Sequence, residues 1–223
     1  MTENTNSKFP SEADVVIVGV GGIVGSMIAY WLSELGQKNI VGLEKSSVIP
    51  SDIASTAHAS DFVYNTTHDK LGCWTTAYSR KFYEDNGFFL KKGGLEICRK
   101  GDDARWEELK RKVGSGKAFG TNVRLISASE AKEKFPLLDE ESLMGAMWDP
   151  DAGLVIPRSQ DVVSFAVESA KDKGALKTFT DTPAIDFEVE NGRVIGVKTE
   201  KGFIKTDKVV ICSGIWGPLM GKK

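Results

Sequence analysis

The chain has 223 residues, 41% of them hydrophobic, and its formal net charge is −2. This length suits one large domain or two interleaved ones, and the near-neutral charge gives no electrostatic case for binding nucleic acid or a membrane surface. No apolar run is long enough to span a bilayer, and residues 1–13 lack the pattern of a secretory or mitochondrial signal. We therefore expect a cytoplasmic globular protein in which residues 1–13 form a disordered tail.

The first predicted unit is a strand, a glycine-rich turn, a helix and a second strand. Asp14 and the apolar run that follows it lead into Gly19-Val-Gly-Gly-Ile-Val-Gly25, and the second strand, 40–43, ends at Glu44. The acid follows the glycines by roughly twenty residues, as in sites where a helix N-terminus binds a dinucleotide diphosphate. The glycine spacing is one residue longer than usual, and the alternative is a tight turn without a ligand. The helix is expected to bury one apolar face, formed by Ile23, Met27, Ile28, Trp31, Leu32 and Leu35.

The rest of the chain alternates between helices and strands. Segment 46–65 has no regular period, and a loop of that length within a domain is usually functional. The dipeptide Asn191-Gly192 predicts a hairpin between strands 185–190 and 194–199. Because a new helix begins at Trp216, we expect the chain to be truncated at its C-terminus. Helices are predicted over 68–83 (with Leu71, Trp74, Tyr78 and Phe82 facing inward), 102–112, 129–135 and 158–173, and strands over 88–99 (a pair broken at Gly93-Gly94), 123–127, 144–148, 176–179 and 208–212.

Several kinds of chemistry have no support in the sequence. Cys73, Cys98 and Cys212 are widely separated and fit no metal-ligand spacing, so each is interpreted as a reduced, small apolar residue. His58 and His68 are the two histidines, too few for a His/Cys metal cluster. No nucleophile elbow precedes a helix, which argues against a hydrolytic triad.

Four segments of the sequence carry a resemblance to a known family. The glycine-rich start, Glu44-Lys45 and Thr206-Asp-Lys-Val-Val-Ile-Cys-Ser-Gly214 together resemble FAD-dependent oxidoreductases of the D-amino-acid oxidase superfamily. The segment Ala54-Ser-Thr-Ala-His-Ala-Ser60 resembles the loop of dimethylglycine and sarcosine dehydrogenases in which a histidine is covalently joined to the flavin. Relatives usually have Gly-Ser-Thr-Trp-His there, so this chain departs from the pattern at Ala54 and Ala57. The similarity covers the N-terminal part of a whole relative.

The resemblance implies an α/β fold, with a glutathione-reductase-type (Rossmann-like) FAD-binding domain interleaved with an α+β portion of a substrate domain. Residues 14–90 would form the first part of the FAD-binding domain, 91–150 the partial substrate domain, and 151–223 the continuation of the FAD-binding domain. His58 would hold the flavin, since a neutral imidazole is a nucleophile. From the residues alone, the alternative is a loop histidine bonded to a backbone carbonyl.

The resemblance also implies which residues bind the cofactor, with no catalytic residue or metal ligand among them. The glycine turn would surround the pyrophosphate, Glu44 and Lys45 the adenosine, and the segment around His58 the flavin. The implied cofactor-binding residues are Gly19, Gly21, Gly22, Ile23, Val24, Gly25, Glu44, Lys45, Ala54, Ser55, Thr56, His58, Ala59, Ser60, Ala184, Ser213 and Gly214.

The implied reaction is the oxidative demethylation of an N-methylated amino acid of the dimethylglycine or sarcosine class, with a hydride passing from the N-methyl carbon to flavin N5. The electron acceptor would be dioxygen or an electron-transfer protein, and tetrahydrofolate would be used in the full-length protein only. Arg158 is a candidate carboxylate anchor, with a surface arginine as the alternative. Two other interpretations remain: a flavin amine oxidase with another substrate, such as a methylaminobutanoate, and a non-catalytic nucleotide-binding module that needs a partner chain.

Overall fold

The computed structural model describes residues 9–221, which form two compact units. Unit 1 combines the segment that ends at Ala59 with the segment that begins at Arg158, and unit 2 contains residues 60–157. Unit 2 is therefore an insertion in unit 1, in agreement with the expected interleaving. Its limits differ from the predicted domain boundaries, because residues 60–90 and 151–157 supply strands that pair with one another inside unit 2.

Unit 1 is built on a four-stranded parallel sheet in the order β13–β1–β2–β9. Every residue of β1 and β2 is buried, as expected for a parallel sheet covered on both faces. The near-continuous apolar runs that predicted these strands reflect this double burial. The strands are β1 (Val15–Val18), β2 (Ile40–Leu43), β9 (Leu176–Phe179) and β13 (Val209–Ile211).

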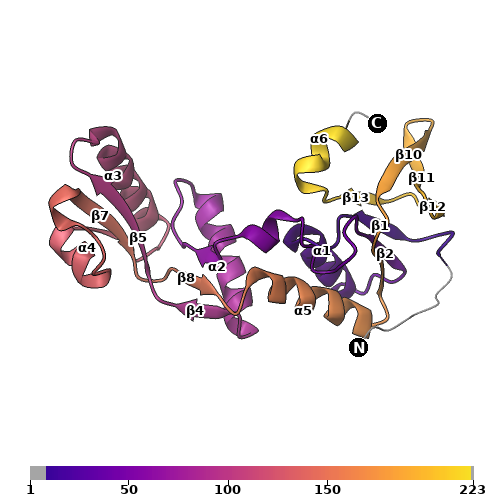
Figure 1. Ribbon diagram of the computed structural model, residues 1–223, viewed down its shortest axis with the longest axis horizontal. Helices are drawn as coiled ribbons and strands as arrows, with labels where there is room; N and C mark the ends of the chain where they lie inside the picture. Colours follow the sequence, from indigo (N-terminus) through magenta and orange to yellow (C-terminus); the bar gives the residue numbers. More distant parts are fainter. Residues whose placement is uncertain (1–8, 222–223) are drawn as a thin grey trace. The chain divides into compact units, whose positions relative to one another are not determined.

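Alternate residues of β1 point to opposite faces of the sheet. Val15 and Ile17 belong to a core cluster with residues of two helices, whereas Val16 and Val18 belong to a cluster with residues of an antiparallel sheet. Strands β1 and β2 therefore lie in the middle layer of three (Figure 1). The outer layers are α1 (Ile23–Glu34) with α5 (Ser159–Asp172), and β10 (Ala184–Glu190), β11 (Arg193–Thr199) and β12 (Gly202–Lys205).

The predicted hairpin forms between β10 and β11, and Asn191 and Gly192 have the positive φ values of 51° and 75° that its tight turn requires. Residues 9–13, which were expected to be disordered, are part of the fold. The amide of Ala13 donates to the Lys205 carbonyl at 3.0 Å, and the Phe9 ring packs edge-on against Phe179. The predicted tail over residues 1–8 lies outside the described residues.

Helix α1 packs through small residues rather than through the whole predicted apolar face. Its buried residues are Gly25, Ser26, Ala29 and Ser33. Of the predicted set, Ile23, Ile28 and Leu32 pack at the edge of the core, but Trp31 and Leu35 are exposed. Small side chains let the helix lie close to the sheet and to α5, and the larger residues are displaced to the sides of this contact.

Unit 2 contains two three-stranded antiparallel sheets and three helices. The predicted strand pair over 88–99 forms as two strands, but they belong to different sheets. Gly93 between them has φ of 77°, and an added Cβ would overlap the Trp148 ring. The sheets are β3–β8–β4 (Phe62–Val63, Gly153–Val155, Phe89–Lys91) and β5–β7–β6 (Gly94–Arg99, Leu143–Asp149, Arg124–Ile126), and the helices are α2 (Lys70–Asp85), α3 (Asp103–Ala118) and α4 (Ala128–Lys134).

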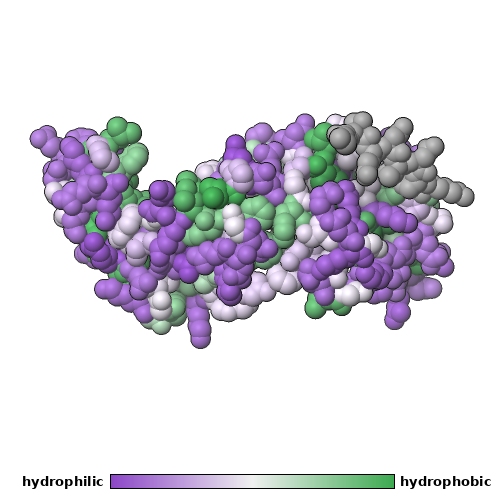
Figure 2. Space-filling model, turned by 90° about the horizontal axis from the view of Figure 1, so that it is seen from below, coloured by the Kyte–Doolittle hydropathy of each residue, from purple (hydrophilic) through white to green (hydrophobic). Residues whose placement is uncertain are grey.

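The predicted inner face of α2 is wrong except at Phe82. Leu71, Trp74 and Tyr78 are exposed, while the buried residues are Cys73 and Phe82. The burial of Cys73 follows from its contacts with Thr67 in the preceding loop, which helical periodicity could not predict. Hydrophilic residues predominate on the face drawn in Figure 2, and hydrophobic residues are exposed in several places.

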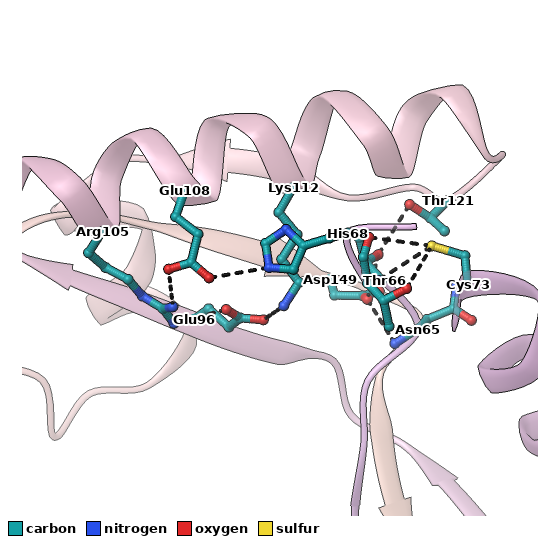
Figure 3. A network of polar contacts seen from close by, with 11 residues as sticks. Asn65, Thr66, His68, Cys73, Glu96, Arg105, Glu108, Lys112, Thr121 and Asp149 are labelled. Atoms are coloured by element: carbon teal, nitrogen blue, oxygen red, sulfur yellow. Dashed lines mark hydrogen bonds and ion pairs between the residues drawn. The ribbon is translucent and has the colours of Figure 1, made fainter. Parts of the chain in front are cut away.

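A polar network joins α3 to the β5–β7–β6 sheet of unit 2 (Figure 3). Glu96 on β5 accepts from Lys112 through one oxygen and from Arg105, at 2.9 Å, through the other. Arg105 also bonds Glu108, which lies 3.2 Å from His68. Lys112 is buried, although it lies on a helix rich in charged residues.

Four short helical segments complete the described chain: η1 (Ser55–His58), η2 (Glu140–Ser142), η3 (Gly214–Trp216) and α6 (Gly217–Met220). No helix among the described residues is long and apolar enough to cross a membrane.

Replacing Gly25 by alanine should destabilise unit 1, because an added Cβ would lie 2.1 Å from the Gly19 carbonyl oxygen. The turn would have to open, and we expect a loss of about 2 kcal/mol or more in the free energy of unfolding. Urea unfolding followed by circular dichroism measures it. Gly22→Ala is the matched control, since its Cβ would meet its nearest neighbour at 3.6 Å; equal losses in the two variants would contradict this account.

Glu96→Gln should leave the buried Lys112 ammonium without its carboxylate. We expect a loss of about 2 kcal/mol, because the cost of an unpaired buried charge exceeds that of an exposed one. Glu107→Gln, which breaks the exposed pair with Lys110, should change stability by less than about 0.5 kcal/mol. Denaturant titrations of both variants test the difference, and similar midpoints would refute it.

Candidate functional site

A pocket of about 350 Å³ lies in unit 1 where the chain leaves the carboxyl ends of the parallel strands. Its walls include Gly19 after β1, Glu44 after β2 and Ser213 after β13. Because β2 and β13 flank β1 on opposite sides, the chain diverges there in both directions. Such a switch point is where open parallel sheets bind ligands.

The glycine turn brings the end of β1 and the start of α1 unusually close. The amides of Gly19 and Val20 both donate to the Leu43 carbonyl, at 2.8 and 3.2 Å. Gly19 has φ of 93°, and an added Cβ would lie 2.5 Å from the Cys212 carbonyl oxygen. Gly25 lies against Gly19 without room for a side chain. Gly25 therefore allows the close helix–strand contact, despite the extra residue in the motif.

The buried carboxylate of Glu44 braces this turn. One oxygen accepts from the Gly21 amide and the other from the Ser46 amide, both at 2.9 Å. Each carboxylate oxygen has a further lone pair that can accept a ligand hydroxyl. Beside it, the Lys45 ammonium lies 4.8 Å from the centre of the Trp216 ring, a cation–π contact on the pocket wall.

The N-terminus of α1 opens into the pocket. Gly22 is its N-cap and offers no side-chain acceptor, and the Ile23 amide instead donates to Thr56 Oγ1 at 3.0 Å. Among the described residues, the amides of Gly22 and Val24 donate to no acceptor, and both residues line the pocket. Unpaired amides at the positive end of a helix dipole are suited to bind an anion such as a diphosphate.

Two serine hydroxyls of the pocket wall, Ser51 Oγ and Ser213 Oγ, are buried and have no hydrogen-bond partner among the described residues. Buried polar atoms are normally satisfied, so both point to a polar ligand. Burial raises the pKa of the nearby Cys212 thiol, which keeps this side chain neutral beside the pocket. An anionic ligand therefore meets no thiolate there.

The pocket brings together most of the residues predicted to bind a cofactor, although their contact with one stays a prediction. Gly21 and Gly25 shape the turn from behind. His58 and Ala59 belong to unit 1 but do not line the pocket, and His58 is exposed; Ser60 belongs to unit 2. The predicted residues on the pocket wall are Gly19, Gly22, Ile23, Val24, Glu44, Lys45, Ala54, Ser55, Thr56, Ala184, Ser213 and Gly214.

Sequence reasoning missed the apolar part of the wall and two polar residues, Ser51 and Thr182. The apolar residues Ile215, Trp216 and Leu219 follow Gly214, and none of them was predicted to bind the cofactor. The exposure of Ile215 and Leu219 could have been suspected from the run of large apolar residues in so short an element. The other missed wall residues are Val18, Leu43, Ile53, Pro183, Cys212 and Met220.

Comparisons with known proteins show which proteins the chain resembles. The chain is 28% identical over 240 residues to human mitochondrial sarcosine dehydrogenase, a match that covers all of the chain and 25% of that protein. It is 30% identical to the mitochondrial pyruvate dehydrogenase phosphatase regulatory subunit of Mus musculus, covering 96% of the chain and 24% of that protein. The chain thus spans about a quarter of the length of these curated relatives.

Among solved structures, L-proline dehydrogenase from P. horikoshii superposes with a TM-score of 0.85 at 30% identity, covering 96% of this chain and 56% of that one. This likeness supports the predicted α/β fold with a cofactor-binding domain interrupted by a second portion. Residues 14–223 match the family described as DAO, FAD dependent oxidoreductase. The chain therefore belongs to the DAO family of FAD-dependent oxidoreductases.

Proposed function

We propose that this chain provides the FAD-binding part of a flavoprotein that oxidatively demethylates an N-methylated amino acid of the sarcosine or dimethylglycine class. The observation that carries the proposal is the pocket at the end of β1, where unpaired helix amides, a buried carboxylate and unsatisfied hydroxyls converge. The similarity to sarcosine dehydrogenase over the whole chain supports the substrate class.

The residues of the pocket fit FAD in charge and in hydrogen-bonding capacity. The amides of Gly22 and Val24 would hold the diphosphate, and the Glu44 carboxylate would accept from the adenosine ribose. The neutral Cys212 adds no repulsion. When bound, FAD would supply the oxidising chemistry, by accepting a hydride equivalent from the N-methyl carbon of the substrate.

His58 is the proposed point of covalent attachment. It closes the η1 turn, two residues after Thr56, whose hydroxyl is bonded to the first amide of α1. This bond ties the turn to the pocket, and the exposed His58 ring is free to react from outside the core. The small neighbours Ala57 and Ala59 leave room for a planar ring beside it.

Substrate and acceptor are less specific parts of the proposal. A methylaminobutanoate is a second substrate candidate, and dioxygen or an electron-transfer protein would reoxidise the flavin. Tetrahydrofolate use belongs to a full-length protein, and the cytoplasmic location stays a prediction. Arg158 is the N-cap residue of α5. Its role as a carboxylate anchor also stays a prediction.

A non-catalytic role is the second candidate, and one observation favours it. The match to a phosphatase regulatory subunit has 30% identity and covers nearly the whole chain, as the match to the dehydrogenase does. In that role the pocket would bind a nucleotide cofactor without turnover, and a partner chain would complete the protein. Anaerobic addition of sarcosine or dimethylglycine distinguishes the enzyme from the non-catalytic protein. Only in the enzyme would the substrate reduce the bound flavin and bleach its absorbance.

Acid precipitation of the protein expressed with FAD should leave yellow flavin in the pellet, because the proposed bond to His58 survives denaturation. His58→Ala should move more than about nine-tenths of the flavin to the supernatant while the native protein still binds FAD, since covalent attachment and noncovalent binding are separate steps. Absorbance of both fractions measures the distribution. His68→Ala is the matched control, because His68 is the other histidine of the chain. Flavin retained in the pellet of the His58 variant would refute the assignment.

A further inference from the structure

The Ser51 side chain is a buried hydroxyl in the cofactor pocket that no other residue uses. It is 2% exposed, and its Oγ has no hydrogen-bond partner among the described residues. A serine buried without a partner costs folding free energy, so a structural role for the hydroxyl is not evident. Because Ser51 lines the pocket, the partner that would satisfy it is a ligand.

The backbone around Ser51 is fixed by contacts on both sides. Its amide donates to the Gly21 carbonyl at 2.9 Å, which joins the loop to the glycine turn. The next residue, Asp52, accepts from Ser46 Oγ at 2.5 Å, which closes the loop on itself. The backbone that carries the Ser51 hydroxyl is therefore fixed by hydrogen bonds.

Ser51 and Glu44 flank the same point of the turn. An ideal Cβ on Gly21 would lie 2.8 Å from Ser51 Cβ and 2.6 Å from Glu44 Oε2. The serine side chain and the carboxylate are thus neighbours, although no hydrogen bond joins them. The glycine at position 21 leaves space for both, since any side chain there would collide with each of them.

The pairing of a carboxylate with a hydroxyl selects for a particular ligand chemistry. A phosphate offers only acceptors and negative charge, both unfavourable beside Glu44. A vicinal diol offers two donors and two acceptors, so one hydroxyl can donate to the carboxylate while the other exchanges a hydrogen bond with the serine. The ligand group that fits this corner is therefore a ribose rather than a diphosphate.

We propose that Ser51 is a specificity-determining residue that hydrogen-bonds one hydroxyl of the adenosine ribose and completes, with Glu44, a site for the ribose diol. The inference rests on the proposed function, because it requires that the adenosine of FAD binds in this pocket. Thr56 and the amides of α1 would hold the diphosphate, while Ser51 would hydrogen-bond the ribose.

Calorimetric titrations with ADP, 2′-deoxy-ADP and 3′-deoxy-ADP test the proposal. Ser51→Ala should weaken ADP binding about fivefold, the effect of one lost hydrogen bond. One deoxy analogue should bind the wild-type protein about fivefold more weakly than ADP, yet bind Ser51→Ala as well as ADP does. Ser47→Ala, an exposed serine of the same loop outside the pocket wall, should leave all three affinities unchanged.

A stability measurement separates recognition from a structural role. Without ligand, Ser51→Ala should unfold at the wild-type temperature or above, because it removes an unsatisfied buried hydroxyl. With saturating FAD, it should gain less thermal stability than the wild type. A lower melting temperature without ligand would overturn the proposal.

The outcomes also separate this inference from the proposed function. If the wild-type protein binds FAD but Ser51→Ala binds ADP equally well, the role of Ser51 fails and the proposed function stands. If Ser51→Ala weakens ADP and both deoxy analogues by the same factor, the ribose assignment is overturned. If the wild type binds neither FAD nor ADP, both proposals fail.

Discussion

The close approach of Gly25 to the Gly19 carbonyl is the constraint on which the rest of the site depends. It allows α1 to start directly against the end of β1, so that the first helix amides face the space beyond the sheet. A longer or bulkier turn would move these amides away from Glu44, which bonds the same turn through Gly21. The contact between Gly25 and Gly19 therefore sets the position of the N-terminus of α1 as well as that of the Glu44 carboxylate.

The loop after β2 becomes a wall because it is tied to this turn at three points. Glu44 receives the Gly21 amide, the Ser51 amide binds the Gly21 carbonyl, and Thr56 receives the Ile23 amide. Each bond joins a residue of the loop to the turn or to the first residue of α1. These three bonds hold an irregular, polar segment in one conformation although it forms no strand. His58 lies at the end of this held segment.

The elements that could be predicted are those that a local sequence pattern specifies. The apolar runs of β1 and β2, the glycine turn and the Asn191-Gly192 hairpin each specify their structure within a few residues. Strands β3 and β8 were not predicted, because such short elements exist only through pairing between distant segments. The same limit explains Ser51, whose burial depends on its bond to Gly21, thirty positions earlier in the chain.

All residues of the pocket wall belong to unit 1, although unit 2 interrupts its sequence. The proposed nucleotide site therefore needs no side chain from unit 2, whatever unit 2 contributes to substrate binding. This separation agrees with the comparable similarity of the chain to a dehydrogenase and to a phosphatase regulatory subunit. In the proposed function, binding of the cofactor depends on the glycine turn, Glu44 and the loop that carries Ser51, whereas turnover would require residues that recognise an amine. Evidence for the first is consequently not evidence for the second, and substrate-dependent flavin reduction is the observation that decides between an enzyme and a binding module.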